Sequence, residues 1–412
     1  MKKTLLACTA FICAVLSISS LTAWAADSDQ QAAAQPEETP APPSLYPGMA
    51  GPLAFSQKPL STDLGQYLGK WYLTGVASGL GFWQSNHVQG DQNWRGDVSN
   101  GQLMINKPDG LVQIFAQVGA YSLPALGTAY IPADQAIHDF YGPFPQGFLK
   151  LQLTDSLSVM GGKLPTLIGA EYTFTFENMN IERGLLWNQE NAVNRGGQIN
   201  YVAGPVTLAA SWNDGFYSNV YSWASGSASW AIDSGNTLSF IGGGNTRHTS
   251  TSSIATPVFQ NNQQIYNLIY THANGPWTIT PYFQFTHVPE IHSIGAFDTA
   301  NTVGFALLMD YRFTDDTSNV AGLPLSGFSL PVRVELIAST GSASDGSPNL
   351  LYGVGSKAFS VTVTPTYQYN FFFVRPEFSF TGAFDTTSGL AFGSNGNNNN
   401  QARLMLEGGV IF

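Results

Sequence analysis

The sequence predicts an all-β protein, a transmembrane antiparallel up-and-down β-barrel of about 16 strands, within a range of roughly 14–18. Three observations lead to this prediction. Apolar and polar residues alternate along segments of about ten residues, whereas soluble strands average five or six. The connections between these segments are short and long in turn. Only 10% of the 412 residues are charged, against about 25% in soluble domains.

The charge and cysteine content exclude several classes of function. The 16 basic and 27 acidic residues give a net charge of −11, which argues against nucleic-acid binding because such proteins need clustered Lys and Arg. Both cysteines, Cys8 and Cys13, lie in the N-terminal apolar region, so we expect no disulfide and no Cys-ligated metal in the exported chain. The 6 histidines show no metal-binding spacing, and no cofactor is predicted.

The N-terminus is typical of an exported protein. Met1-Lys2-Lys3 precedes an apolar stretch, 5–21, and the small-x-small motif Ala23-Trp24-Ala25 follows directly. This order predicts a secretory signal peptide over residues 1–25, with an N-terminal membrane anchor as the alternative. Residues 26–68 are rich in Ala, Gln and Pro and show no hydrophobic period, so we expect a flexible leader outside the main fold.

The barrel is predicted over residues 69–412, where period-two alternation recurs. Val332 and Leu336, for example, fall on one face of a strand, and Arg333 and Glu335 fall on the other. No apolar run of about 18 residues follows the signal peptide, so no later transmembrane helix is expected. The sixteen expected strands lie at roughly 70–78, 101–106, 111–119, 147–154, 157–163, 195–203, 205–213, 221–232, 236–245, 263–272, 276–287, 302–312, 328–340, 357–367, 370–381 and 403–412.

The connections favour a membrane barrel over a soluble β-sandwich. Most alternate between tight turns and long loops, although the loop near 214–220 is brief and the turn 313–327 is long. Long loops at one end and tight turns at the other are typical of outer-membrane barrels. Such a barrel must close, because an open sheet edge would leave backbone groups unpaired in hydrocarbon.

The last strand and several aromatic residues fit the same scheme. Leu404 and Leu406 fall on one face of the final strand, Arg403 and Glu407 fall on the other, and the chain ends on Phe412. This ending resembles the C-terminal signal of outer-membrane barrels and implies recognition by the barrel-assembly machinery. An aromatic girdle is expected at the strand ends, with ordinary core packing as the alternative for each member: Trp71, Trp212, Trp223, Trp277, Tyr311 and Tyr367.

Two stretches of the sequence resemble a known family. Residues 162–171 run from Gly-Lys to Gly-Ala-Glu, and residues 178–187 form an Asn-rich stretch containing Arg183. This pattern, with Arg375-Pro376-Glu377 before alternating aromatics, resembles the putative beta-barrel porin-2 family of bacterial outer membranes. The resemblance covers about 70–412 in layout. It implies an outer-membrane channel and specifies no substrate.

The long connection 164–194 is the most charged of the long loops, and we expect it to fold inward and constrict a pore. Its charged residues are Glu171, Glu177, Glu182, Arg183 and Glu190. Opposed charges in a narrow passage would create a transverse field that sorts solutes. The alternative is that these charges form interior salt bridges that stabilise the wall. The candidate pore-wall residues are Lys150, Asp310, Arg312, Arg333, Glu335, Arg375, Glu377, Arg403 and Glu407.

The predicted function is passive diffusion of small hydrophilic solutes or ions through a water-filled barrel in the outer membrane. A carbohydrate-selective porin is the first alternative, because Phe115 and Tyr282 fall on polar strand faces where they could stack on sugar rings. A hydrolase or an adhesin built on a closed barrel is another, but no Gly-x-Ser-x-Gly elbow is present and no enzyme is predicted. Expected partners are membrane lipid and lipopolysaccharide, with a homotrimer as a further possibility.

Overall fold

The computed structural model describes residues 48–315, 317–320 and 322–412. The predicted signal peptide and the first part of the predicted leader, 26–47, lie outside these residues. Within the described ranges no helix has the length and hydropathy needed to cross a membrane.

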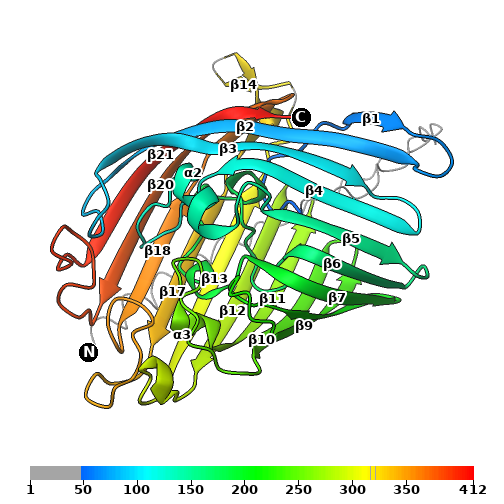
Figure 1. Cartoon of the computed structure of the whole chain (residues 1–412). Helices are drawn as coiled ribbons and strands as arrows, with labels where there is room; N and C mark the ends of the chain where they lie inside the picture. The colour runs from blue at the N-terminus through cyan, green and yellow to red at the C-terminus, as the bar shows by residue number, and fades with distance from the viewer. Residues whose placement is uncertain (1–47, 316, 321) are drawn as a thin grey trace, which may run out of the picture. The chain divides into compact units, whose positions relative to one another are not determined.

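Sixteen antiparallel strands form a closed barrel, as predicted (Figure 1). Each strand pairs with the next along the chain, and β2 pairs with β21 from Val76 opposite Ile411 to Gln84 opposite Arg403, which closes the ring. The barrel strands are β2 (Lys70–Gln84), β3 (Trp94–Lys107), β4 (Val112–Tyr121), β5 (Gln146–Gln152), β6 (Leu157–Pro165), β7 (Val193–Ala203), β8 (Val206–Asn213), β9 (Trp223–Asp233), β10 (Asn236–Asn245), β11 (Gln264–Asn274), β12 (Trp277–Val288), β13 (Ala300–Tyr311), β17 (Val332–Ser339), β18 (Lys357–Val363), β20 (Phe372–Phe384) and β21 (Asn400–Ile411).

Prolines interrupt two of the predicted strands. The expected strand 328–340 is divided at Pro331 into β16 (Phe328–Ser329) and β17, and the expected strand 357–367 is divided at Pro365 into β18 and β19 (Thr366–Tyr369). Proline has no N–H to donate to the ladder, so pairing stops locally and resumes beyond it. Both β18 and β19 pair with β20, so the barrel wall continues past the break.

The connections hold the remaining short elements. Gly204 and Gly275 each begin a two-residue turn with φ of 58°, a conformation that costs glycine little. The third long connection, residues 166–192 and called L3 below, links β6 to β7. The elements outside the main barrel strands are β1 (Leu60–Asp63), β14 (Asn319–Val320), β15 (Leu323–Pro324), α2 (Ala133–Gln135), α3 (Val258–Asn261), the π-helix η1 (Ala136–Phe140), and the 3-10 turns η2 (Thr175–Glu177), η3 (Trp187–Gln189), η4 (His292–Ile294) and η5 (Leu325–Gly327).

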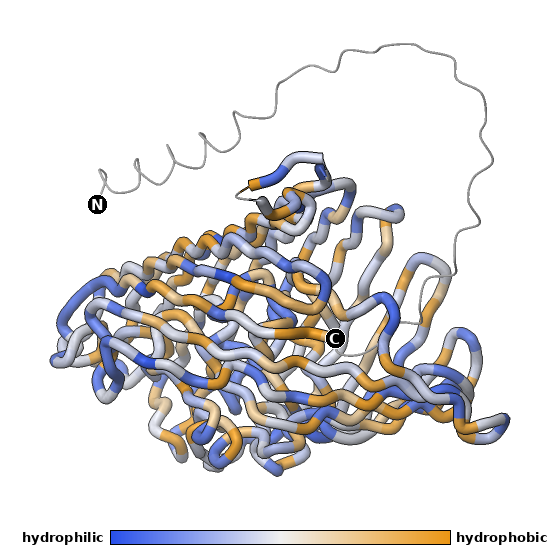
Figure 2. The backbone as a smooth tube through the Cα atoms, turned by 90° about the horizontal axis from the view of Figure 1, so that it is seen from above, coloured by the Kyte–Doolittle hydropathy of each residue, from blue (hydrophilic) through white to orange (hydrophobic). Residues whose placement is uncertain are grey.

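The two faces of the wall differ as the alternation predicts. In β21, Leu404 and Leu406 are 51% and 55% exposed, whereas Arg403 and Glu407 are buried. Figure 2 shows hydrophobic and hydrophilic segments alternating along the strands. Exposed apolar side chains on the outer face are what hydrocarbon requires of a barrel wall. Others on this face are Leu103, Ile105, Leu149, Phe283, Phe305, Leu336 and Phe378.

The expected aromatic girdle is present in part. Trp212 and Trp277 lie at strand ends and are 51% and 45% exposed. Trp223 does not belong to it, because its ring is fully buried and its Nε1–H donates to the carbonyl oxygen of Asn261 at 2.8 Å. For Trp223 the alternative of core packing is therefore correct.

The final part of the predicted leader contacts the barrel. Residues 60–63 form β1, which pairs with the start of β2. Leu53 is 2% exposed, and the Phe55 ring packs edge-on against Phe176 at 5.9 Å between centroids. The expectation of a leader wholly outside the main fold therefore does not hold for residues 48–63. Apolar side chains of this segment pack against the barrel and L3, and its strand pairs with β2.

Candidate functional site

Six charged side chains project from three strands onto the inner face of the wall. They alternate with the exposed apolar residues of β17, β20 and β21, and each is 2% exposed or less. They are Arg333, Glu335, Arg375, Glu377, Arg403 and Glu407. Charges this deeply buried need partners, since an isolated ion in a low-dielectric interior is very costly.

The arginines of this group bind L3. Arg333 Nη1 lies 2.5 Å from Glu171 Oε1, and Arg403 Nη1 pairs with Glu182 Oε1. Arg375 donates to the carbonyl oxygen of Thr175 at 2.9 Å. Two ion pairs and a charge-assisted hydrogen bond thus connect the loop to three different strands.

The glutamates of the wall bind the same loop through its backbone. Glu377 accepts the N–H groups of Ile181 and Glu182 at 2.6 and 3.0 Å. Glu335 accepts those of Leu185 and Leu186 at 3.0 and 3.2 Å. Because L3 makes no strand ladder here, these carboxylates satisfy backbone donors that would otherwise be buried without partners.

Burial alters the acid–base behaviour of L3. Removal from water raises the pKa of Glu177 to about 8 and raises the pKa of Glu190 well above its usual range. It also lowers the pKa of Arg183 to about 10, although several glutamates oppose that change. At neutral pH part of the acidic excess in this network is therefore protonated.

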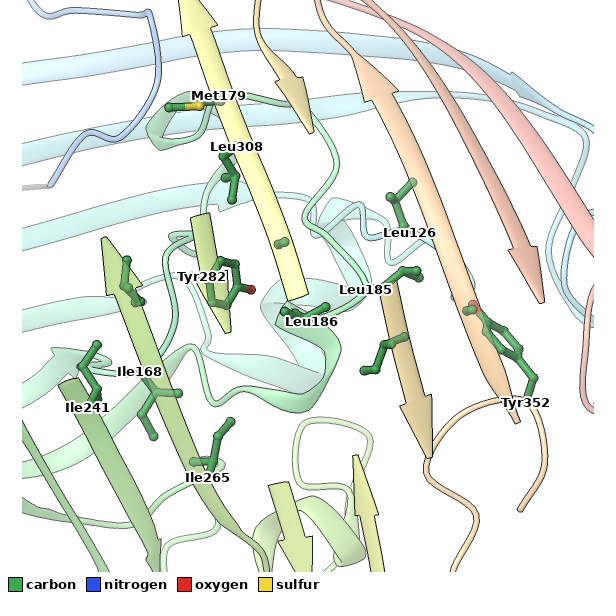
Figure 3. Close-up of a cluster of buried hydrophobic side chains, with 14 of the residues drawn as sticks. Leu126, Ile168, Met179, Leu185, Leu186, Ile241, Ile265, Tyr282, Leu308 and Tyr352 are labelled. Atoms are coloured by element: carbon green, nitrogen blue, oxygen red, sulfur yellow. The ribbon is translucent and has the colours of Figure 1, made fainter. Parts of the chain in front are cut away.

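Apolar side chains complete the contact between L3 and the wall. Ile168 and Leu186 of L3 belong to the same buried cluster as Ile241, Ile265 and Tyr282, which point inward from β10, β11 and β12 (Figure 3). The inner face of these strands is thus apolar where the loop covers it. L3 is held by hydrophobic contacts on this side of the barrel and by charges on the other.

Open space remains beside L3 on the hydrophobic side. A cavity of about 590 Å³ lies between residues 165–173 and the inner face of β9 to β13. Its wall includes the hydroxyls of Ser227, Ser229, Ser239, Thr271, Thr278 and Thr280. A second cavity of about 410 Å³ is lined by residues of several long loops, and Ala192 borders both. The hydroxyl-lined cavity carries few charges, chiefly Glu171 and Arg312.

The structure brings most of the predicted site residues together. Glu171, Glu177, Glu182, Arg183 and Glu190 all lie buried in L3, and the six charges of β17, β20 and β21 face that loop. Asp310 and Arg312 form a separate ion pair of 3.4 Å at the turn end of β13. Lys150, on β5, takes part in none of the ion pairs formed by the described residues.

The hydroxyl residues that line the cavity are not among the residues predicted from the sequence. A sequence pattern that could have indicated this lining is the row Ser225, Ser227 and Ser229, which alternate with small or apolar residues along β9. Phe115 and Tyr282, expected on polar strand faces where they could stack on sugar rings, are both buried, Phe115 beside Phe148 and Tyr282 under L3.

The comparison with protein families agrees with this architecture. The model of the family described as putative beta-barrel porin-2, OmpL-like, matches residues 70–412, which is the whole barrel. The chain belongs to this family. No curated protein matches the chain in sequence. Membership in the porin-2 family and the fold together indicate an outer-membrane β-barrel channel.

Solved structures show the same fold as this porin-2 protein. The anion-selective porin from Comamonas acidovorans is 11% identical to this chain. The two structures match over 83% of this chain and 99% of that porin, with a TM-score of 0.54. OmpT of Vibrio cholerae is 12% identical, with 85% and 100% covered and a TM-score of 0.51. The outer membrane channel DcaP of Acinetobacter baumannii is 10% identical, with 83% and 97% covered and a TM-score of 0.50. At these identities the likeness concerns the fold alone.

Proposed function

We propose that this protein lets small hydrophilic solutes diffuse passively across the outer membrane. The observation that carries the proposal is the hydroxyl-lined cavity of about 590 Å³ inside a closed wall whose outer face is apolar. Hydrocarbon contacts the outside and water fills the inside, so the barrel provides a path through the membrane that needs neither a nucleophile nor a cofactor.

L3 sets the width of this path. Its contacts with Arg333, Arg375 and Arg403 hold it on one side of the barrel, and Ile168 and Leu186 pack on β10 to β12 on the other. The passage is therefore the hydroxyl-lined cavity that remains beside L3 along β9 to β13. The charges predicted to sort solutes are mostly buried against each other, and the passage is lined largely by Ser and Thr. We therefore propose selection mainly by size, with weak selection by charge.

A carbohydrate-selective porin is the second candidate. The cavity of about 410 Å³ among the long loops is lined by the rings of Phe140, Tyr141 and Trp187 and by the amides of Asn188 and Gln189. Rings that stack and amides that bind hydroxyl groups form a site suited to sugars. Sugar rings would therefore stack in this cavity and not on Phe115 or Tyr282, which are buried.

Assembly and partners are part of the same proposal. OmpT of Vibrio cholerae, similar in fold with a TM-score of 0.52, is described in a trimer form, and a homotrimer is proposed here. Phe412 exchanges two backbone hydrogen bonds with Gly75, both of 2.9 Å, so the C-terminal residue lies at the barrel seam. We propose that the assembly machinery recognises this end, and that lipopolysaccharide surrounds the outer rim.

The test is planar-bilayer recording with the purified mature protein, together with relative permeability to sugars, cations and anions. Stepwise ohmic conductance with similar permeability to small cations and anions is expected. Saturable sugar transport would favour the carbohydrate-selective candidate. A barrel that conducts nothing would overturn the proposal and leave a hydrolase or an adhesin.

A further inference from the structure

Residues 49–57, called the strap below, lie inside the barrel although they precede its first strand. Leu53 belongs to one buried apolar cluster with Val76 of β2, Met104 of β3 and Ile411 of β21, which all point inward. Leu53 therefore fixes the strap among side chains of the inner wall, while Ala54, Ser56 and Gln57 are exposed.

The strap binds L3 directly. The N–H groups of Ala50 and Gly51 donate to the carbonyl oxygen of Glu177 at 2.8 and 3.2 Å, and Phe55 packs on Phe176. A Cβ atom at Gly51 would lie 2.2 Å from the carbonyl oxygen of Asn178. Only glycine fits at this position, so the strap is seated in one place along the loop.

The strap also binds the wall at the turn end of the barrel. Arg312, which follows β13, donates to the carbonyl oxygen of Gly51 at 2.9 Å. The side-chain amide of Gln368, on β19, bonds both backbone groups of Ala54, at 2.9 and 2.7 Å. The strap is thus held by hydrogen bonds to the loop on one side and to two parts of the wall on the other.

The position of the strap divides the open space at this end. Met49, Ala50 and Gly51 line the cavity of about 590 Å³. Pro52 and residues 54–58 line a further cavity of about 600 Å³ at the turns, which reaches Phe328 and Phe412. Arg312, which is bonded to Gly51, borders both cavities, so the strap and Arg312 lie between them.

We propose that the strap is a second constriction element, which narrows the turn end of the lumen and braces residues 172–178 of L3. This inference rests on the proposed function, because a narrowing has meaning only in a conducting barrel. Release of the strap joins the two cavities and widens the path. The strap therefore sets the size limit of the channel together with L3.

Single-channel conductance of strap variants tests the proposal in the full mature chain. Leu53→Asp places a charge in the apolar cluster and should release the strap, which raises conductance because the turn end of the lumen becomes wider. Gly51→Val should have the same effect by collision with Asn178. Leu64→Asp is the matched control, because Leu64 is 50% exposed, and it should leave conductance unchanged. Conductance equal to wild type in both strap variants would overturn the inference.

A second measurement follows the strap without relying on conductance. The predicted mature chain has no cysteine, so Leu53→Cys and Leu60→Cys each introduce a single thiol. A membrane-impermeant thiol reagent should label position 53 about ten-fold more slowly than position 60, because burial restricts access to local opening. Equal labelling rates would show that the strap is not seated. If the wild-type barrel conducts no current but position 53 is labelled slowly, the proposed channel function would be refuted, while the position of the strap would stand.

Discussion

Glu182 and Glu177 lie in the same buried segment, yet replacing each with Gln should have different consequences. Glu182 pairs with Arg403 and accepts the hydroxyl of Ser379 at 2.6 Å. Burial raises the pKa of Glu177 to about 8, so at pH 7 its carboxyl group is mostly protonated and resembles an amide. Glu177→Gln should therefore leave the contacts of L3 intact, whereas Glu182→Gln leaves a buried arginine without its carboxylate.

The size of the effect follows from the burial of that pair. Arg403 is 1% exposed, and removing one partner of a buried ion pair costs about 3–5 kcal/mol. Arg403 keeps hydrogen bonds to Gln84 and Ala125, of 2.7 and 2.8 Å, so we expect the lower end of this range. About 3 kcal/mol corresponds to roughly a hundredfold shift in the equilibrium between bound and released L3.

Single-channel recording at pH 7 is the assay, with the thermal unfolding midpoint as the second readout. Glu182→Gln should show larger current steps or more frequent excursions to a higher conductance, and a lower midpoint than wild type. Glu177→Gln, the matched control, should keep the wild-type conductance, and its midpoint should not fall below that of wild type, because Gln removes the cost of protonating a buried carboxylate. A Glu182→Gln channel identical to wild type would refute the assignment of this ion pair as an anchor of L3. The same conclusion would follow if only Glu177→Gln changed the conductance.

Three further predictions concern Glu177, the cavity wall and the outer belt. Because burial raises the pKa of Glu177 from 4.5 to about 8, the unfolded chain alone loses this proton as the pH rises between these values, and stability should fall by up to ~1.4 kcal/mol per pH unit. Thermal midpoints measured from pH 5 to 8 should show this slope, and Glu177→Gln should reduce it. Ser227→Arg in the cavity wall should shift reversal potentials toward anions, while Ser234→Arg, in an exposed turn, should not. Leu406→Arg on the outer belt should cost about 2–4 kcal/mol near the bilayer midplane, measured as the fraction folded into lipid vesicles, and an unchanged fraction would argue against a lipid-facing position.

The barrel could be predicted from the sequence because its signal is local. Alternation within each strand, such as Arg333 and Glu335 against Val332 and Leu336, is enough to assign two faces and sixteen strands. What covers the inner face is a different matter. Alternation treats a charge in open water and a charge paired under a loop in the same way.

The contacts that decide the site are distant in sequence. Glu171 and Arg333 are 162 residues apart, and Ala54 and Gln368 are 314 residues apart. No local pattern records such pairings, since they depend on which strand stands opposite which loop in the closed ring. For the same reason the sequence does not reveal that Ile241 and Ile265 are apolar exceptions on the inner face because L3 packs against them.

The seam between β2 and β21 has a consequence for biogenesis. The first strand of the ring, β2, pairs on one side with β21, which is the last strand to be synthesised and has 12 residues, Asn400–Ile411. A nascent product lacking that strand would present two bare sheet borders, and each unpaired amide or carbonyl costs several kcal/mol in lipid. Truncated chains should therefore fail to insert, so insertion into the bilayer selects for chains that contain every strand.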